Sequence, residues 1–165
     1  ALPFLALGWY LAALVVILLN RLLDGLDGAL ARRRGLTDAG GFLDISLDFL
    51  FYALVPFGFI LAAPQQNALA GGWLLFAFIG TGSSFLAFAA LAAKHQIDNP
   101  GYAHKSFYYL GGLTEGTETI LLFVLGCLFP AWFAWFAWIF GALCWMTTFT
   151  RVWSGYLTLK SLQRQ

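Results

Sequence analysis

The sequence predicts an all-α protein, a polytopic bundle of helices that spans a membrane. Hydrophobic residues make up 61% of the 165 residues and charged residues only 10%, whereas a soluble domain carries about 25% charged residues. Five apolar stretches are each long enough to cross the hydrocarbon core, which takes roughly 20 residues, and no alternation typical of barrel strands persists. This composition excludes a disordered chain, a nucleic-acid-binding module and a secreted disulfide scaffold.

The first three expected spans follow one another with short connections. A predominantly apolar run predicts the first span, and acidic residues begin directly after it. The second span follows a pair of glycines and contains Pro56, where we expect a kink. The third contains Gly80 and other small residues, which allow close packing between helices. The expected bounds are Pro3–Leu23, Gly41–Ala63 and Leu69–Ala93.

A more polar segment separates these spans from the last two. The fourth span, expected over Leu110–Phe129, carries two glutamates near its start. The fifth, expected over Ala131–Leu159, is interrupted by Arg151. The two cysteines, Cys127 and Cys144, fall inside these apolar runs, so we expect buried and unreactive thiols.

The charged residues gather at one side of this alternating layout. All nine lysines and arginines lie at the first and third connections or toward the C-terminus, and the other two connections carry no charge. Basic residues favour the cytoplasmic side of a membrane. We therefore expect an integral protein of the cytoplasmic (inner) membrane. The eight acidic residues lie on the same side, so the active site is expected to face the cytoplasm.

Two pairs of aspartates flank the first connection. Asp24 and Asp27 are three residues apart, and Asp44 and Asp48 are four apart, so each pair shares one face of a helix. A connection of about eight residues makes the two helices antiparallel neighbours, and the four carboxylates are then expected to converge. Because they repel one another at low dielectric, protons or cations must compensate them. Two Mg²⁺ or Mn²⁺ ions shared by these aspartates would form a clamp for phosphoryl transfer.

Residues around the same connection suit an anionic nucleotide. Gly28, Gly40 and Gly41 allow the nucleotide to approach the backbone closely, and the first amides of a helix favour anions. Arg32 lies about two turns beyond Asp24 on the expected helix and can hold a phosphate with its fork of donors.

This stretch resembles the signature of the CDP-alcohol phosphatidyltransferases, D-x-x-D-G-x-x-A-R followed by G-x-x-x-D-x-x-x-D. The resemblance implies a six-helix fold. On that basis residues 1–165 form a single transmembrane domain in which the first family helix is missing, with five spans visible and six expected in the intact protein. The chain supplies all eight fixed positions within 25 residues, in the order Asp24, Asp27, Gly28, Ala31, Arg32, Gly40, Asp44 and Asp48.

The resemblance also implies a role for each of these positions. Asp24, Asp27 and Asp44 would ligate one metal ion, and Asp24, Asp44 and Asp48 would hold or adjoin a second. Asp48 would also be the general base that takes the proton of the acceptor alcohol. The implied reaction is a step of phospholipid biosynthesis that transfers phosphatidyl from CDP-diacylglycerol to a small polar alcohol and releases CMP. The implied CDP-binding residues are Asp27, Gly28, Ala31, Arg32 and Gly40.

The acceptor site is expected on the same side, at four charged residues near the last spans: Lys105, Glu115, Glu118 and Arg151. Arg151 either binds an anionic acceptor, such as a phosphorylated polyol, or extends to the membrane interface. Glu115 and Glu118 either contact an amine or hydroxyls of the acceptor or pair with Lys105 or Arg151. The acceptor alcohol and a homodimer both stay open, and we expect no nucleic-acid partner beside the substrates and the bilayer.

Two other membrane functions also place acidic residues in helices. A membrane prenyltransferase uses aspartate-rich helices and Mg²⁺, but it needs more helices than 165 residues allow and lacks the D-G-x-x-A-R stretch. A divalent-cation transporter should carry acidic residues near the middle of the membrane, whereas the outer half of this chain is uncharged. Release of CMP from a CDP-lipid distinguishes the transferase from both.

Overall fold

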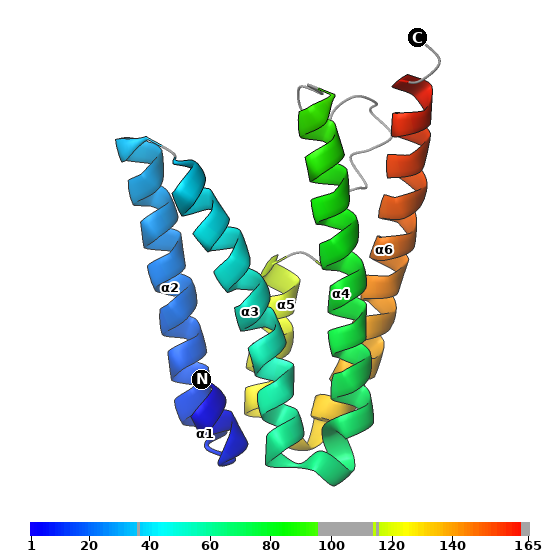
Figure 1. Ribbon diagram of the computed structural model, residues 1–165. Coiled ribbons are helices and arrows are strands. Elements are labelled where there is room, and N and C mark those ends of the chain that lie inside the picture. Colours follow the sequence, from blue (N-terminus) through cyan, green and yellow to red (C-terminus); the bar gives the residue numbers. More distant parts are fainter. Residues whose placement is uncertain (36, 96–113, 115, 163–165) are drawn as a thin grey trace.

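The computed structural model describes residues 1–35, 37–95, 114 and 116–162 of the chain. Within these ranges every regular element is helical, which confirms the predicted all-α bundle. The elements follow one another along the chain as Figure 1 shows. Their bounds are α1 Leu2–Ala6, α2 Tyr10–Arg34, α3 Asp38–Ala62, α4 Pro64–Lys94, α5 Gly116–Leu128, the 3₁₀ turn η2 Pro130–Trp132 and α6 Phe133–Leu162.

Each of the five expected spans corresponds to one of the helices α2 to α6. In the described part of the chain, three segments are long and apolar enough to cross a membrane: Asp38–Ala62, Pro64–Lys94 and Pro130–Ser161. The helix α5 is apolar but shorter, and α2 joins an apolar first half to a charged second half. The protein is therefore a helical membrane bundle.

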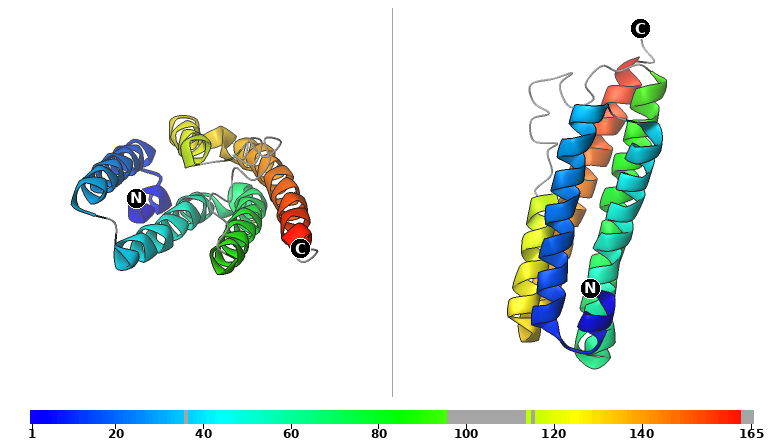
Figure 2. Two further views of the ribbon diagram at one scale, coloured as in Figure 1. Left: turned by 90° about the horizontal axis from the view of Figure 1, so that it is seen from above. Right: turned by 90° about the vertical axis from the view of Figure 1, so that its left-hand side faces the viewer.

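The helices α2 to α6 run alternately in opposite directions (Figure 1). The helix α4 packs against α3 and α6, and α5 packs against α2 and α6, so that the view from above shows α5 on the opposite side of α3 from α4 (Figure 2). The C-terminal ends of α2, α4 and α6 lie at one end of the bundle, and they carry Arg34, Lys94 and Lys160. The described basic ends thus share one side, as predicted.

The best-packed part of the core lies at the other end of the bundle. The side chains of Phe59, Phe123 and Phe133 are fully buried, and the rings of Phe59 and Phe133 stack with their centroids 4.0 Å apart. The short helix α1 closes this end, because it contacts α2 and α3 and places Leu5 directly over Gly58.

The expected first span, Pro3–Leu23, is wrong at both ends. The chain breaks at Gly8, whose φ of 74° lies in the left-handed region that favours glycine. After the break, α2 continues through the first aspartate pair and ends only at Arg34. The connection to α3 therefore has three residues instead of about eight, and it turns at Gly35, where φ is 101°.

Two later helices also differ from the prediction. The helix α4 begins at Pro64 rather than Leu69, because proline fits the first turn of a helix without loss of a hydrogen bond. The buried Asn67 supports this turn by donating from Nδ2 to the carbonyl of Phe59 over 2.9 Å. The helix α6 is not interrupted at Arg151 but runs through it.

The thiols and the fourth span agree with the prediction as far as they are described. Cys127 and Cys144 are both free and buried. The helix α5 covers the second part of the expected span Leu110–Phe129. Residues 110–113 and Glu115 lie outside the described residues, as does Lys105.

Candidate functional site

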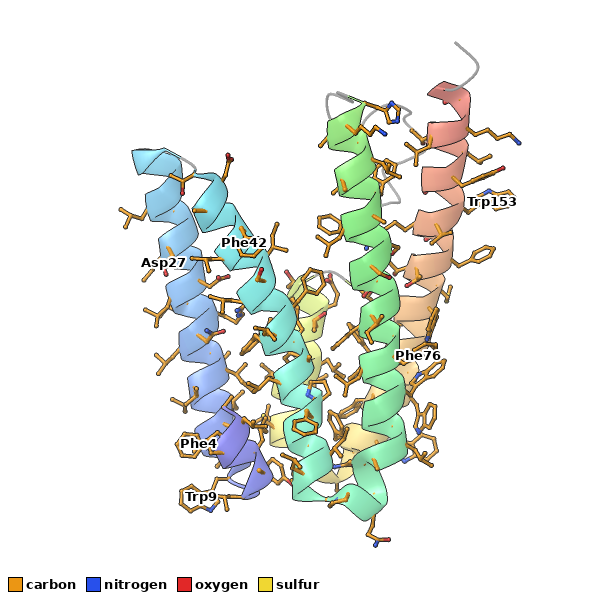
Figure 3. All side chains as sticks on the ribbon, in the orientation of Figure 1. Phe4, Trp9, Asp27, Phe42, Phe76 and Trp153 are labelled. Atoms are coloured by element: carbon orange, nitrogen blue, oxygen red, sulfur yellow. The ribbon has the colours of Figure 1, made fainter. Side chains whose placement is uncertain are left out.

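The four aspartates lie on α2 and α3, in the halves of these helices that meet at the short connection. Asp24 and Asp27 belong to α2, and Asp44 and Asp48 belong to α3. Figure 3 labels Asp27 on α2 and Phe42 on α3 at this end of the bundle, far from Phe4 and Trp9. Because both segments are helical, the spacings of three and four residues put each pair on one face, as predicted.

Each pair has one exposed and one partly buried member. Asp27 and Asp44 are exposed, whereas Asp24 and Asp48 are partly buried. Asp24 is close enough to the other three carboxylates for their negative charges to disfavour a negative charge on Asp24. We call these four side chains the aspartate cluster, since Asp24 lies within electrostatic reach of the other three.

Arg21 is the residue that sequence reasoning missed at this site. Its Nη1 lies 2.9 Å from Oδ1 of Asp48 and 3.5 Å from Oδ2 of Asp24. Its guanidinium carbon also lies 4.4 Å from the centre of the Phe51 ring. The spacing of three residues between Arg21 and Asp24 could have indicated the first contact, but Asp48 lies 27 residues away.

The guanidinium of Arg21 thus occupies the space between Asp24 and Asp48. In the ranges that the structure describes, no three histidine, cysteine, aspartate or glutamate side chains surround one point closely enough to hold an ion. The chemistry of the donor set nevertheless fits a hard divalent cation, because all four groups offer carboxylate oxygens from two facing helices.

The start of α3 is fixed by a cap at Thr37. The Thr37 side chain accepts a hydrogen bond from the backbone N–H of Gly40 over 3.1 Å, as N-cap residues do. A Cβ at Gly40 would lie 3.0 Å from that hydroxyl oxygen, so a side chain there would crowd the cap. Gly40 is exposed and remains accessible from outside the helix.

The other residues expected to bind CDP lie on α2. Gly28 is partly buried, one residue after the exposed Asp27. Ala31 and Arg32 follow within the last turns of the same helix. Together with Gly40 at the start of α3, the expected nucleotide-binding positions surround the short connection between the two helices.

A cavity of about 370 Å³ opens beside Asp48, and its size is in the range of small-molecule sites. It lies among α3, α4, α5 and α6, and the surface of its wall is more apolar than polar. The polar groups that line it include Asp48, Tyr52, Thr81, Thr119 and Arg151. The cavity thus joins an aspartate of the cluster to an arginine of the last helix.

Arg151 reaches this cavity from α6. Its Nη1 donates to the carbonyl of Thr81 on α4 over 3.1 Å, and its guanidinium carbon lies 5.7 Å from the centre of the Phe85 ring. Glu118 is exposed in the first turn of α5 and is not part of the cavity wall. Of the expected acceptor-binding residues with described side chains, Arg151 therefore lines the cavity and Glu118 does not.

Comparison with known proteins gives one family and one close relative. A family described as CDP-alcohol phosphatidyltransferase matches residues 1–153. The chain is also similar to the inner membrane protein YnjF of Escherichia coli (strain K12). The two are 99% identical over 165 residues, which are all of this chain and 80% of that protein. No solved structure matches the chain.

Proposed function

The chain belongs to the CDP-alcohol phosphatidyltransferase family, and from this we propose that it transfers a phosphatidyl group from CDP-diacylglycerol to an alcohol acceptor and releases CMP. The observation that carries the proposal is the position of Asp48. This carboxylate belongs to the aspartate cluster of α2 and α3 and also lines the cavity that extends to Arg151. One side chain can therefore serve both the donor phosphate and the acceptor.

Divalent metal ions belong to the chemistry of this family, and the carboxylate oxygens of the cluster suit them. We infer two ions, Mg²⁺ or Mn²⁺, the first held by Asp24, Asp27 and Asp44 and the second by Asp24, Asp44 and Asp48. When bound, such ions neutralise charge that develops on the phosphates.

The protein groups then hold the substrates and move one proton. Gly28, Ala31, Arg32 and Gly40, together with Asp27, hold the CDP group beside the connection between α2 and α3. The acceptor oxygen attacks the β-phosphorus, and the bond from that phosphorus to the bridging oxygen breaks. CMP leaves with that oxygen, and the proton of the acceptor hydroxyl passes to Asp48, which acts as a general base.

We assign the cavity beside Asp48 to the acceptor alcohol and infer that Arg151 binds an anionic group of it, such as the phosphate of a phosphorylated polyol. A guanidinium matches the geometry of a phosphate. Tyr52 and Thr81 supply further polar atoms along the wall. Lys105, Glu115 and Glu118 remain proposed acceptor contacts outside the part of the wall that the structure describes.

Replacing Arg151 by alanine is expected to raise the acceptor KM by about 10-fold or more, because a hydrogen bond to a charged group is worth roughly 1.5–3 kcal/mol. The KM for the CDP-lipid should change by less than about twofold. Steady-state kinetics with each substrate varied in turn measures both. Lys160→Ala, which removes a cation outside the cavity wall, is the matched control. An unchanged acceptor KM would assign Arg151 to helix packing through Thr81.

The proposed location is the inner membrane, with the aspartate cluster facing the cytoplasm. Its support is that the helix ends carrying Arg34, Lys94 and Lys160 share one side, and that the YnjF relative is named an inner membrane protein. A membrane-impermeant thiol reagent applied to intact cells should label Gln66→Cys but not Lys160→Cys, which reacts only after the inner membrane is opened. The native thiols are buried and give little background. Equal labelling of both positions in intact cells would contradict this orientation.

The acceptor can be identified with membranes that contain the protein. Labelled CDP-diacylglycerol is incubated with a panel of phosphorylated polyols, uncharged polyols and amino alcohols, and the lipid products are separated. The role assigned to Arg151 predicts a new phospholipid with a phosphorylated polyol. A product formed only with an amino alcohol would keep the transferase function and overturn the anionic acceptor.

A further inference from the structure

Arg21 is held more firmly than a surface arginine. Its Nε and Nη2 both donate to the side-chain oxygen of Asn20, over 3.2 and 2.8 Å, and its Nη1 donates to Asp48 over 2.9 Å. The flat face of the guanidinium covers the ring of Phe51, and the Tyr52 ring lies 5.8 Å away. Only 17% of the side chain is exposed. Partners on two helices thus fix its position and its orientation.

These contacts join α2 and α3 where the two helices pack loosely against each other. The helix α2 packs against α1 and α5, and its backbone makes few close approaches to α3. The long side chain of Arg21 bridges this distance and connects α2 to α3 beside the aspartates. Since Asp48 accepts this hydrogen bond through Oδ1, the bridge also determines where the Asp48 carboxylate stands at the edge of the cavity.

Arg21 differs in this respect from Arg151. Arg151 lines the cavity, whereas Arg21 does not. Arg21 contacts two aspartates to which the proposed function gives roles, and it lies on the side of Asp48 that faces α2. We therefore expect no direct contact between Arg21 and the acceptor. Arg21 would affect the reaction through Asp48 and Asp24.

We propose that Arg21 is a positioning residue of the transferase site, which holds Asp48 at the edge of the acceptor cavity and offsets part of the negative charge of the cluster. The proposal rests on the proposed function. It has two separate consequences. Loss of the fork of donors releases Asp48 and slows turnover, and loss of the positive charge makes the cluster more attractive to a divalent cation.

The two consequences are measured with Arg21→Gln and Arg21→Lys in the full chain, purified in detergent. Mn²⁺ binding is followed by the loss of the free-ion signal in electron paramagnetic resonance, and kcat and KM are measured in parallel. Arg21→Gln is expected to lower kcat by about 10–100-fold, with the KM for the CDP-lipid within about twofold. The same variant is expected to bind Mn²⁺ about 3–10-fold more tightly.

Arg21→Lys separates charge from geometry. A lysine keeps the positive charge but cannot bond Asn20 and Asp48 with a planar fork. Its Mn²⁺ affinity should therefore stay within about twofold of the wild type, while its kcat lies between those of the wild type and Arg21→Gln. Lys160→Gln serves as the control for loss of a cation elsewhere, and neither readout should change.

Three results would overturn the proposal. An unchanged kcat in Arg21→Gln would show that the contact between Arg21 and Asp48 serves only helix packing. Weaker Mn²⁺ binding in that variant would show that Arg21 does not offset the negative charge of the aspartate cluster. Wild-type kcat in Arg21→Lys would show that the fork is not needed. An inactive wild type that still shows the predicted Mn²⁺ shifts would instead refute the transferase function, so the two failures are distinguishable.

Discussion

Replacing Asp48 by asparagine is expected to lower kcat by about 10²–10⁴-fold, the usual contribution of a general base. The amide keeps the shape of the side chain and one oxygen but cannot take the proton of the acceptor hydroxyl. Binding of CDP should change little, because Asp24, Asp27 and Asp44 still supply one complete set of carboxylates. Turnover is measured with saturating substrates, and CDP affinity is measured on the purified variant.

Asp24→Asn is the matched comparison, since Asp24 also contacts Arg21 but is not part of the cavity wall. We assign Asp24 to both ions, so its loss should weaken CDP binding as well as turnover. The two aspartates are therefore distinguished by comparing the loss of CDP affinity with the loss of turnover in each variant. Near-native turnover in Asp48→Asn would assign the proton to water or to another group.

Removal of divalent ions is expected to abolish activity, and addition of Mg²⁺ or Mn²⁺ should restore it. The physical reason is the repulsion among the four carboxylates and the donor phosphates, which Arg21 offsets only in part. Activity is measured after dialysis against excess chelator and again during titration with each ion. Ca²⁺, which accepts larger and more flexible coordination than Mg²⁺, is the control ion and should restore less activity. Full turnover in the presence of chelator would refute the proposal that the reaction depends on metal ions.

The helices and the candidate motif could be predicted because both depend on local sequence. A run of apolar residues fixes a span, and spacings of three and four residues put each aspartate pair on one helix face. The bounds of the first span failed because Gly8 broke an apolar run that hydropathy alone reads as continuous. Its second end failed because the motif itself is helical as far as Arg34.

The contacts between helices could not be predicted in the same way. Arg21 was visible one turn before Asp24, but its bond to Asp48 depends on how far α2 and α3 stand apart. The cavity that joins Asp48 to Arg151 likewise depends on the packing of α4 against α3 and α6. Such distances depend on how side chains from several helices pack together. Local spacing in one sequence does not predict this packing.

CMP release by the purified protein tests the transferase function directly. Labelled CDP-diacylglycerol is supplied with Mg²⁺ and the acceptor panel, and nucleotide and lipid products are counted together. We expect one CMP for each new phospholipid, formed only when an acceptor is present and lost in Asp48→Asn. Absence of CMP with every acceptor, from a wild-type protein that is folded and binds Mn²⁺, would contradict the transferase function.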